Sequence, residues 1–217
     1  MKSLNISIEY LTHKLSDQSH EAGYDFTPLR LDYLSHLLSK PPRLAAVLVP
    51  FLRITDDWHL LFTRRTEKLP EHSGQVAFPG GRMDHGESSP EQTALREAYE
   101  EIGLQPDRVR VIGRLRSIIT VTNYQVTPIV GVIPWPYPIQ VEQGEVQRIF
   151  TIPLSWLAQP DNHELRQHTR LLPNTGHESG IESESVTMPV IYFKEYDGET
   201  LWGVTAQIVV SLLQILF

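Results

Sequence analysis

Apolar residues along this chain of 217 residues follow two patterns. Short apolar runs bounded by polar or turn-forming residues are typical of β-strands, and apolar residues three and four positions apart are typical of amphipathic helices. The first pattern predicts strands at residues 45–53, 58–64, 75–78, 109–119, 125–133 and 146–151. A turn at 55–57 is expected to pair the first two strands.

Helical patterns occur on both sides of these strands. A helix is predicted at 28–40, where two prolines stop it, and a last helix is predicted at 205–217. Residues 188–193 and 199–202 are expected to form a hairpin over an Asp-Gly turn. Strands flanked by separate helices predict an α/β or α+β fold, with a mixed sheet sandwiched between helices.

The chain length suits one domain with an extension. We expect residues 1–43 to form an N-terminal extension with a helix, and residues 44–217 to form the main domain. Residues 162–185 are polar and contain many His, Glu, Ser and Asn residues, so we expect a loop insertion there.

A central helix has clear signals at both of its ends. Ser89 suits the N-cap, Pro90 suits the first helical position, and Gln92 completes a capping box. Gly103 suits the position at which the chain leaves the helix. The sequence therefore predicts a helix with well-defined bounds in the middle of the chain.

One side of this helix is apolar and the other is acidic. The residues expected on the buried side are Leu95, Ala98, Tyr99 and Ile102. The other side carries Glu97, Glu100 and Glu101, because positions three and four apart share a helix face. Crowded carboxylates repel one another unless a cation is present, and hard divalent metal ions prefer oxygen ligands. The pattern therefore predicts a divalent metal site on this face.

A solvated acidic stripe is the alternative interpretation, because charge runs on helices usually face water. Three features of the neighbouring sequence favour the metal site. Gly80 and Gly81 are expected to form a turn that lets the backbone approach a neighbour closely. Glu87 adds a further acid before the helix, and Arg96 can fix Glu87 or Glu100 by bidentate pairing.

Composition narrows the possible functions. The chain has 19 Lys and Arg residues against 26 Asp and Glu residues, a net charge of −7, and no basic patch that would suit a nucleic-acid partner. It has no cysteine, which excludes disulfides and thiolate metal sites, and its nine histidines form no HExxH-type pair. We expect no membrane partner and a cytoplasmic location, because no apolar run approaches the roughly 18 residues of a membrane span and the N-terminus lacks a signal-peptide core.

The segment that contains the acidic helix resembles the Nudix box, G-x5-E-x7-R-E-U-x-E-E-x-G-U, in which U is an aliphatic residue. The matching residues are Gly81, Glu87, Arg96, Glu97, Ala98, Glu100, Glu101, Gly103 and Leu104. Eight residues, not seven, separate Glu87 from Arg96, and Ala98 is small for its position. The longer spacing is similar to that of the coenzyme A diphosphatase-like branch of the Nudix family.

Residues upstream of the box also resemble this branch, whose signature is similar to LLTxRSxxLRxHxGxxxFPGG. Residues 61–81 read LFTRRTEKLPEHSGQVAFPGG, in which Arg65 and His72 match and Pro70 replaces the usual arginine. That replacement removes a guanidinium that could bind a phosphate. Further similarity to the branch occurs at 123–128, 145–154 and 202–206.

The resemblance implies the Nudix fold and hydrolysis of a nucleoside-linked diphosphate with Mg²⁺ or Mn²⁺. It implies Glu97, Glu100 and Glu101 as metal ligands, with Glu100 and Glu101 also acting in catalysis. Glu87 and Arg96 would have structural roles. The chemistry agrees, because metal ions neutralise the phosphate oxygens and lower the pKa of a bound water. The resemblance is also compatible with a homodimer.

Further candidates lie outside the acidic helix. Glu145 is the expected general base, and Glu142 is the alternative. The substrate-binding candidates are Arg65, His72, Gly80 and Gly81. A guanidinium suits a phosphate because it offers a fork of donors. The alternatives are an exposed loop acid for either glutamate, a surface strand arginine for Arg65, a structural histidine for His72 and a role in the turn alone for the two glycines.

Three interpretations of the function follow. The first is a diphosphatase whose small-molecule substrate is coenzyme A or acyl-coenzyme A, with phosphopantetheine and adenosine 3′,5′-bisphosphate as products. The second keeps the chemistry but takes ADP-ribose or a dinucleoside polyphosphate. The third is a non-catalytic module that senses a nucleotide. The complete glutamate set argues against the third, because a pure binder does not need a metal cluster.

Overall fold

The computed structural model describes residues 6–16, 41–67, 74–171 and 185–217. The helix predicted at 28–40 lies outside the described residues, and so do His72 and Pro70. Within the described residues, no helix is both long enough and apolar enough to cross a membrane.

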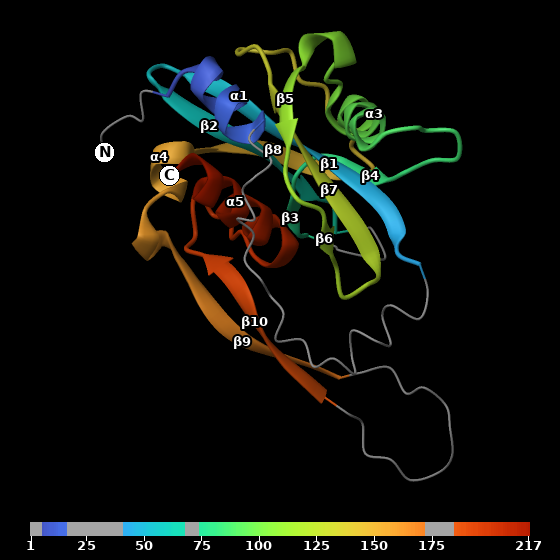
Figure 1. Cartoon of the computed structure of the whole chain (residues 1–217), viewed down its shortest axis with the longest axis vertical. Helices are drawn as coiled ribbons and strands as arrows, with labels where there is room; N and C mark the ends of the chain where they lie inside the picture. Colours follow the sequence, from blue (N-terminus) through green and yellow to red (C-terminus); the bar gives the residue numbers. More distant parts are fainter. Residues whose placement is uncertain (1–5, 17–40, 68–73, 172–184) are drawn as a thin grey trace.

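An eight-stranded mixed sheet forms the centre of the structure (Figure 1). Its strands are β1 (Arg43–Ile54), β2 (Asp57–Arg65), β3 (Val76–Ala77), β4 (Gly80–Arg82), β5 (Arg110–Arg114), β6 (Ile118–Ile119), β7 (Tyr124–Val132) and β8 (Val146–Pro153). The main path runs β3-β2-β1-β7-β5, while β4 pairs with β1, β6 with β7 and β8 with β2. Only the β1–β7 pairing is parallel among these strands.

Helices cover both faces of this sheet. They are α1 (Ile8–Ser16), α3 (Pro90–Ile102), α4 (Leu154–Leu157) and α5 (Gly203–Leu216), with 3-10 turns η1 (Pro106–Arg108) and η2 (Pro160–Asn162). Figure 1 shows α3 on one side of the sheet and α5 on the other. Leu48 and Val49 are neighbours in β1 but belong to different core clusters, because side chains alternate across a strand. Leu48 packs with Ala98 and Ile102 of α3, so the expected sandwich of a mixed sheet between helices is confirmed.

The strand predictions need two corrections. The strand expected at 109–119 is two short strands, β5 and β6, because the β5–β7 register shifts between Val111 and Gly113 and β5 ends at Arg114. Gly80 and Gly81 do not form a turn but belong to β4, antiparallel to β1. Side-chain-free residues are needed there, because a Cβ at Gly80 would collide with the Ala46 carbonyl oxygen.

The expectation of a loop at 162–185 is wrong for residues 163–171. Residues 163–171 form β9 (His163–Leu171), which pairs antiparallel with β10 (Ser185–Phe193), and residues 172–184 lie outside the described residues. Polar composition concealed this strand, because pairing with a partner strand can override local propensity. The β9–β10 pairing also corrects the hairpin expected between residues 188–193 and 199–202. The chain does turn back at Asp197-Gly198, but only through isolated bridges, and the regular partner of β10 is β9.

Helix α3 begins and ends where its capping residues predict. The Ser89 hydroxyl accepts a hydrogen bond from the Gln92 backbone N–H (3.3 Å), while the Gln92 side chain accepts from the Ser88 N–H (2.8 Å). Gly103 ends the helix in the left-handed conformation, with φ 68°. The buried face differs from the prediction, because Tyr99 is 48% exposed. The helix is rotated so that Thr93, Glu101 and the small residues Ala94 and Ala98 face the sheet.

Arg96 fastens the loop between β4 and α3 to the helix. Its Nε donates to Glu87 Oε1 (2.9 Å), and its Nη2 donates to the Arg82 carbonyl oxygen (2.9 Å). Its Nη1 donates to Glu100 Oε2 (2.9 Å), so both partners predicted for this arginine are present. Glu87 also accepts from the Thr93 hydroxyl (2.7 Å) and the Asp84 N–H (2.7 Å). Hydrogen bonding from Arg96 is the main cause that lowers the pKa of Glu87 to about 2.

Glu87→Gln should reduce the free energy of unfolding by about 1.5 kcal/mol at pH 7, because it replaces hydrogen bonds between two charged groups with weaker bonds to a neutral acceptor. Glu87 has a lower pKa in the folded state than in the unfolded state, so its contribution is complete above about pH 5 and is lost as the pH falls towards 2. Urea unfolding at pH 7, 5 and 3 measures this difference. Glu195→Gln, at an exposed position, is the matched control. The prediction would be contradicted if the free energies of unfolding of Glu87→Gln and wild type differed as much at pH 3 as at pH 7.

Candidate active site

Two glutamates on successive turns of α3 face the strand β4. Glu101 is buried, with only 4% of its side chain exposed. Its carboxylate accepts from the Gly80 backbone N–H at 3.3 Å and contacts Arg65 Nη1 at 3.4 Å. Sequence reasoning missed the bond from Gly80, because it arises only when β4 and α3 are packed together. The bond holds the Glu101 carboxylate against the edge of the sheet.

Glu97 lies directly over Gly81. A Cβ added at Gly81 would lie 2.5 Å from Glu97 Oε1, so the missing side chain provides the space that this carboxylate occupies. The Glu97 side chain is 16% exposed, and its Oε1 lies 2.9 Å from Arg96 Nη1. Gly80 and Gly81 therefore position the two carboxylates, one through a backbone N–H and the other through its lack of a side chain.

Glu100 is placed differently from the other two glutamates. Its side chain is 55% exposed and pairs with Arg96 one turn earlier. The three glutamates of the expected acidic face thus differ in exposure: Glu101 is buried, Glu97 is partly buried and Glu100 lies at the surface. The rotation of α3 that exposes Tyr99 also explains this difference, because it turns Glu101 towards the sheet.

A loop brings a further carboxylate to this region. Residues 140–145, between β7 and β8, lie against the C-terminal end of α3, where the N–H groups of Gln140 and Glu142 donate to the carbonyl oxygens of Ile102 and Glu101. These bonds satisfy carbonyls that a helix end leaves unpaired. The loop leads into β8 and carries Glu145, whose carbonyl oxygen accepts from the Thr66 N–H (2.9 Å).

The electrostatic environment links Glu97, Glu101 and Glu145. Burial, helped by the charges of Glu97 and Glu145, raises the pKa of Glu101 to about 8 against the opposing effects of Arg65 and the Gly80 N–H. Burial also raises the pKa of Glu97, with smaller contributions from Glu100 and Glu145 that Arg96 opposes. The site therefore crowds carboxyl groups whose ionised forms a bound cation would stabilise.

Arg65 reaches this acidic region from the end of β2. Its side chain is 25% exposed, and its only described ion pair is the one with Glu101. Its Nε atom is buried and has no hydrogen-bond partner within the described part of the chain. The position predicted for a phosphate-binding residue thus lies beside the acidic helix, whereas His72 lies outside the described residues.

The donor set fits a hard divalent cation. Glu97, Glu100, Glu101 and Glu145 offer only carboxylate oxygens, the ligands that Mg²⁺ and Mn²⁺ prefer. The Gly81 position leaves room for the Glu97 carboxylate beside the sheet. In the arrangement described, however, no three His, Asp or Glu side chains of the described residues converge as a metal-binding group. Arg65 and Arg96 contact these carboxylates instead.

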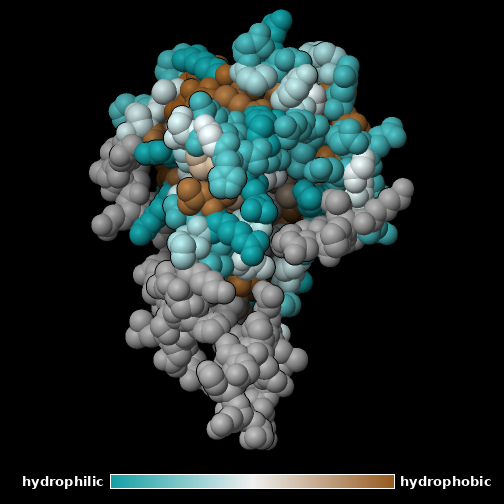
Figure 2. All heavy atoms as spheres, turned by 90° about the vertical axis from the view of Figure 1, so that its right-hand side faces the viewer, coloured by the Kyte–Doolittle hydropathy of each residue, from teal (hydrophilic) through white to brown (hydrophobic). Residues whose placement is uncertain are grey.

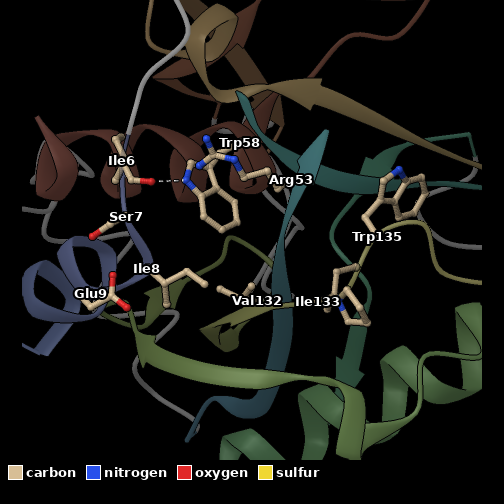
Figure 3. Close-up of a pocket in the computed structure, with 10 residues that line it drawn as sticks. Ile6, Ser7, Ile8, Glu9, Arg53, Trp58, Val132, Ile133 and Trp135 are labelled. Atoms are coloured by element: carbon tan, nitrogen blue, oxygen red, sulfur yellow. Dashed lines mark hydrogen bonds between the residues drawn. The ribbon is translucent and has the colours of Figure 1, made fainter. Parts of the chain in front are cut away.

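A cavity among the described residues lies elsewhere. Its volume is about 390 Å³, and it is lined by residues 6–9 around the start of α1, by Arg53 and Trp58, and by residues 132–135 at the end of β7 (Figure 3). Arg53 lies near the C-terminal end of β1, six residues beyond the Val47–Gly80 pair, which corresponds to about 20 Å along a strand. The cavity is therefore separate from the acidic helix. The surface seen from the side that carries α3 and β4 is mainly hydrophilic (Figure 2).

Comparison with known proteins identifies the family. A family model described as NUDIX domain matches residues 42–175. The relative named "Uncharacterized Nudix hydrolase NudL" from Yersinia pestis (strain Pestoides F) is 38% identical over 180 residues, which cover 83% of each chain. The protein of the same name from Yersinia pseudotuberculosis serotype O:3 (strain YPIII) gives the same values.

Solved structures give a weaker similarity. A MutT/nudix family protein from Enterococcus faecalis is 15% identical with a TM-score of 0.48, over 97% of this chain and 74% of that chain. A C. elegans Ap4A hydrolase is 21% identical with a TM-score of 0.45, over 51% of this chain and 80% of that chain.

The matched family region contains β4, α3 and the loop with Glu145, and so it includes the site described above. Nudix hydrolases generally use divalent metal ions such as Mg²⁺ or Mn²⁺ and take small nucleotide derivatives as substrates. This chain belongs to the Nudix hydrolase family and is an enzyme that acts on phosphorus-containing anhydrides.

Proposed function

We propose that this enzyme is a metal-dependent diphosphatase whose substrate is coenzyme A or acyl-coenzyme A, which it cleaves to a phosphopantetheine and adenosine 3′,5′-bisphosphate. The observation that carries the proposal is the contact between Arg65 and Glu101 at the acidic helix. Arg65 belongs to the signature similar to that of the coenzyme A diphosphatase-like branch, and Glu101 belongs to the Nudix box. The two motifs therefore meet at one site.

Other segments similar to this branch also meet around the site. The Thr66 hydroxyl donates to the Gly144 carbonyl oxygen (3.0 Å), which links the upstream signature to the loop with Glu145. The Thr205 hydroxyl at the start of α5 donates to the Val76 carbonyl oxygen (3.0 Å), just before the two glycines of β4. These contacts give segments far apart in the sequence a shared location and support the coenzyme A assignment.

Each residue has a defined role in the proposed reaction. Glu97 and Glu101 would hold Mg²⁺ or Mn²⁺, and Glu100 would be the third ligand, directly or through water. The bound ion neutralises charge on the diphosphate oxygens and lowers the pKa of a bound water. Arg65 offers its guanidinium to a phosphate, which helps to align the phosphorus for in-line attack.

Glu145 takes a proton from the attacking water in this proposal. Its carboxylate is exposed, and its charge acts on both Glu97 and Glu101. Glu142, the alternative base, uses its carboxylate to accept from the Gly144 N–H (3.1 Å) within the loop. Glu145 is therefore the better placed of the two to serve as the general base.

Turnover of coenzyme A should exceed turnover of ADP-ribose and of diadenosine tetraphosphate by at least about tenfold in kcat/KM, a difference of about 1.4 kcal/mol in transition-state binding. The assay uses Mg²⁺ and Mn²⁺ in parallel, and chromatography identifies the products. Faster cleavage of ADP-ribose or of the dinucleoside substrate would replace the coenzyme A assignment with the second interpretation. Binding of all three without cleavage would favour a nucleotide-sensing module.

Glu101→Gln should reduce kcat by about two to four orders of magnitude, because it removes a charged ligand worth several kcal/mol of transition-state stabilisation. The fold should survive, since glutamine has nearly the same size as glutamate and burial already disfavours the charge that the substitution removes. Steady-state kinetics measures kcat, thermal unfolding tests whether the fold survives, and Mn²⁺ titration measures metal binding by the variant. Turnover equal to that of the wild type would rule out Glu101 as a metal ligand.

Glu145→Gln should lower kcat by about 10²–10⁴-fold, the usual contribution of a general base. Glu142→Gln is the matched control, because it changes the same residue type in the same loop and should have little effect on kcat. Steady-state kinetics of both variants compare the two candidates directly. A larger loss in Glu142→Gln than in Glu145→Gln would reverse the assignment of the base.

A further inference from the structure

We infer that Arg65 is an exchangeable counter-ion: it pairs with Glu101 in the absence of a divalent cation and moves to a substrate phosphate when the cation binds. This inference rests on the proposed function and deepens it. It couples metal binding to substrate binding through one guanidinium. It also assigns a second role to a residue otherwise expected only to bind phosphate.

The contact between Arg65 and Glu101 has the geometry of a weak pairing. One guanidinium nitrogen lies 3.4 Å from one carboxylate oxygen, beyond the 2.7–2.9 Å typical of charge-assisted hydrogen bonds. The Nε–H of Arg65 is buried without a partner among the described residues, although a guanidinium offers five donors in a fixed fork. Arg65 therefore keeps donors for another acceptor in the same place.

Arg64 provides a direct comparison within the same strand. Its Nη1 donates to Glu199 at 2.8 Å, and Glu199 has only 4% of its side chain exposed. The two arginines have different partners, and the β2–β8 register is irregular between them, so they serve different surroundings. The short bond of Arg64 ties β2 to the turn that precedes α5, which is a fixed structural role. The long contact of Arg65 with a proposed metal ligand has no such anchoring function.

The charges around Glu101 explain why a cation would displace Arg65. At equal distance, a divalent cation repels a guanidinium about twice as strongly as one carboxylate attracts it. A cation held by Glu97 and Glu101 therefore weakens the Arg65–Glu101 pair. The pairing with Arg65 and Arg96 also accounts for the lack of a converging carboxylate group within the described residues. Arg96 stays with the framework, and Arg65 holds Glu101 apart from the other carboxylates until a cation replaces it.

The exchange makes metal and phosphate binding mutually supportive. A phosphate that draws Arg65 away from Glu101 leaves that carboxylate free for the cation. By linkage, a cation that takes Glu101 leaves Arg65 free for the phosphate, and the two effects are equal in free energy. Substrate without metal, or metal without substrate, would then bind more weakly than the two together.

Metal titration without nucleotide tests the inference independently of catalysis. Mn²⁺ binding, measured by electron paramagnetic resonance of the free ion, should be about tenfold tighter for Arg65→Gln than for wild type, because a repelling charge is removed. Arg65→Lys should resemble wild type, since it keeps the charge. Arg64→Gln is the matched control and should leave the Mn²⁺ affinity unchanged. Unchanged or weaker Mn²⁺ binding by Arg65→Gln, or an equal change in Arg64→Gln, would overturn the inference.

A measurement on the unmodified protein covers the case in which Arg65→Gln does not fold. In protein labelled with ¹⁵N-arginine, addition of Mg²⁺ should shift the Nε–H resonance of Arg65 and leave that of Arg64 in place. A resonance of Arg65 that does not move on saturation with Mg²⁺ would refute the exchange. If neither Mn²⁺ nor Mg²⁺ binds at all, the metal-dependent function fails as well, which distinguishes that outcome from failure of the exchange alone.

Discussion

The close approach of β4 to its neighbours is the constraint on which the site depends. A Cβ at Gly80 would collide with the backbone of β1. A Cβ at Gly81 would occupy the place of the Glu97 carboxylate on α3. Together these contacts set the distance between the sheet and the acidic helix. They also direct a backbone N–H at Glu101, a carboxylate that is otherwise expensive to bury. Without two glycines in sequence, the helix could not bring its carboxylates to the sheet.

Charge balance around the helix follows from this packing. Burial raises the pKa values of Glu97 and Glu101, while Arg96 and Arg65 approach the same carboxylates from the helix itself and from β2. The two arginines differ in what they hold. Arg96 fastens the preceding loop through Glu87 and the Arg82 carbonyl, so it belongs to the framework. Arg65 makes one long contact, and its buried Nε–H has no acceptor within the described part of the chain, which suits a residue that acts on a ligand.

Local signals predicted the framework of the site with good accuracy. The start and end of α3, the partners of Arg96 and the main strands of the sheet all depend on residues close in sequence or on apolar periodicity. Predictions failed where a distant partner decides the outcome. Tyr99 is exposed and Glu101 buried because the sheet sets the rotation of α3, and residues 163–171 form a strand because β10 lies alongside them. Neither partner can be identified from local composition.

The sequence by itself indicated the fold family, through the resemblance of residues 81–104 to the Nudix box, and its capping residues placed three glutamates at fixed positions on one short helix. It also identified Glu145 and Arg65 as candidates through their motifs. Only the tertiary structure decided which carboxylates are buried, which arginine contacts each one, and that the loop with Glu145 closes on the end of α3. The physical reason is that burial and ion pairing depend on distances between segments that are remote in sequence. Helix periodicity fixes the direction of a side chain relative to its own axis, but packing fixes the surroundings that it meets.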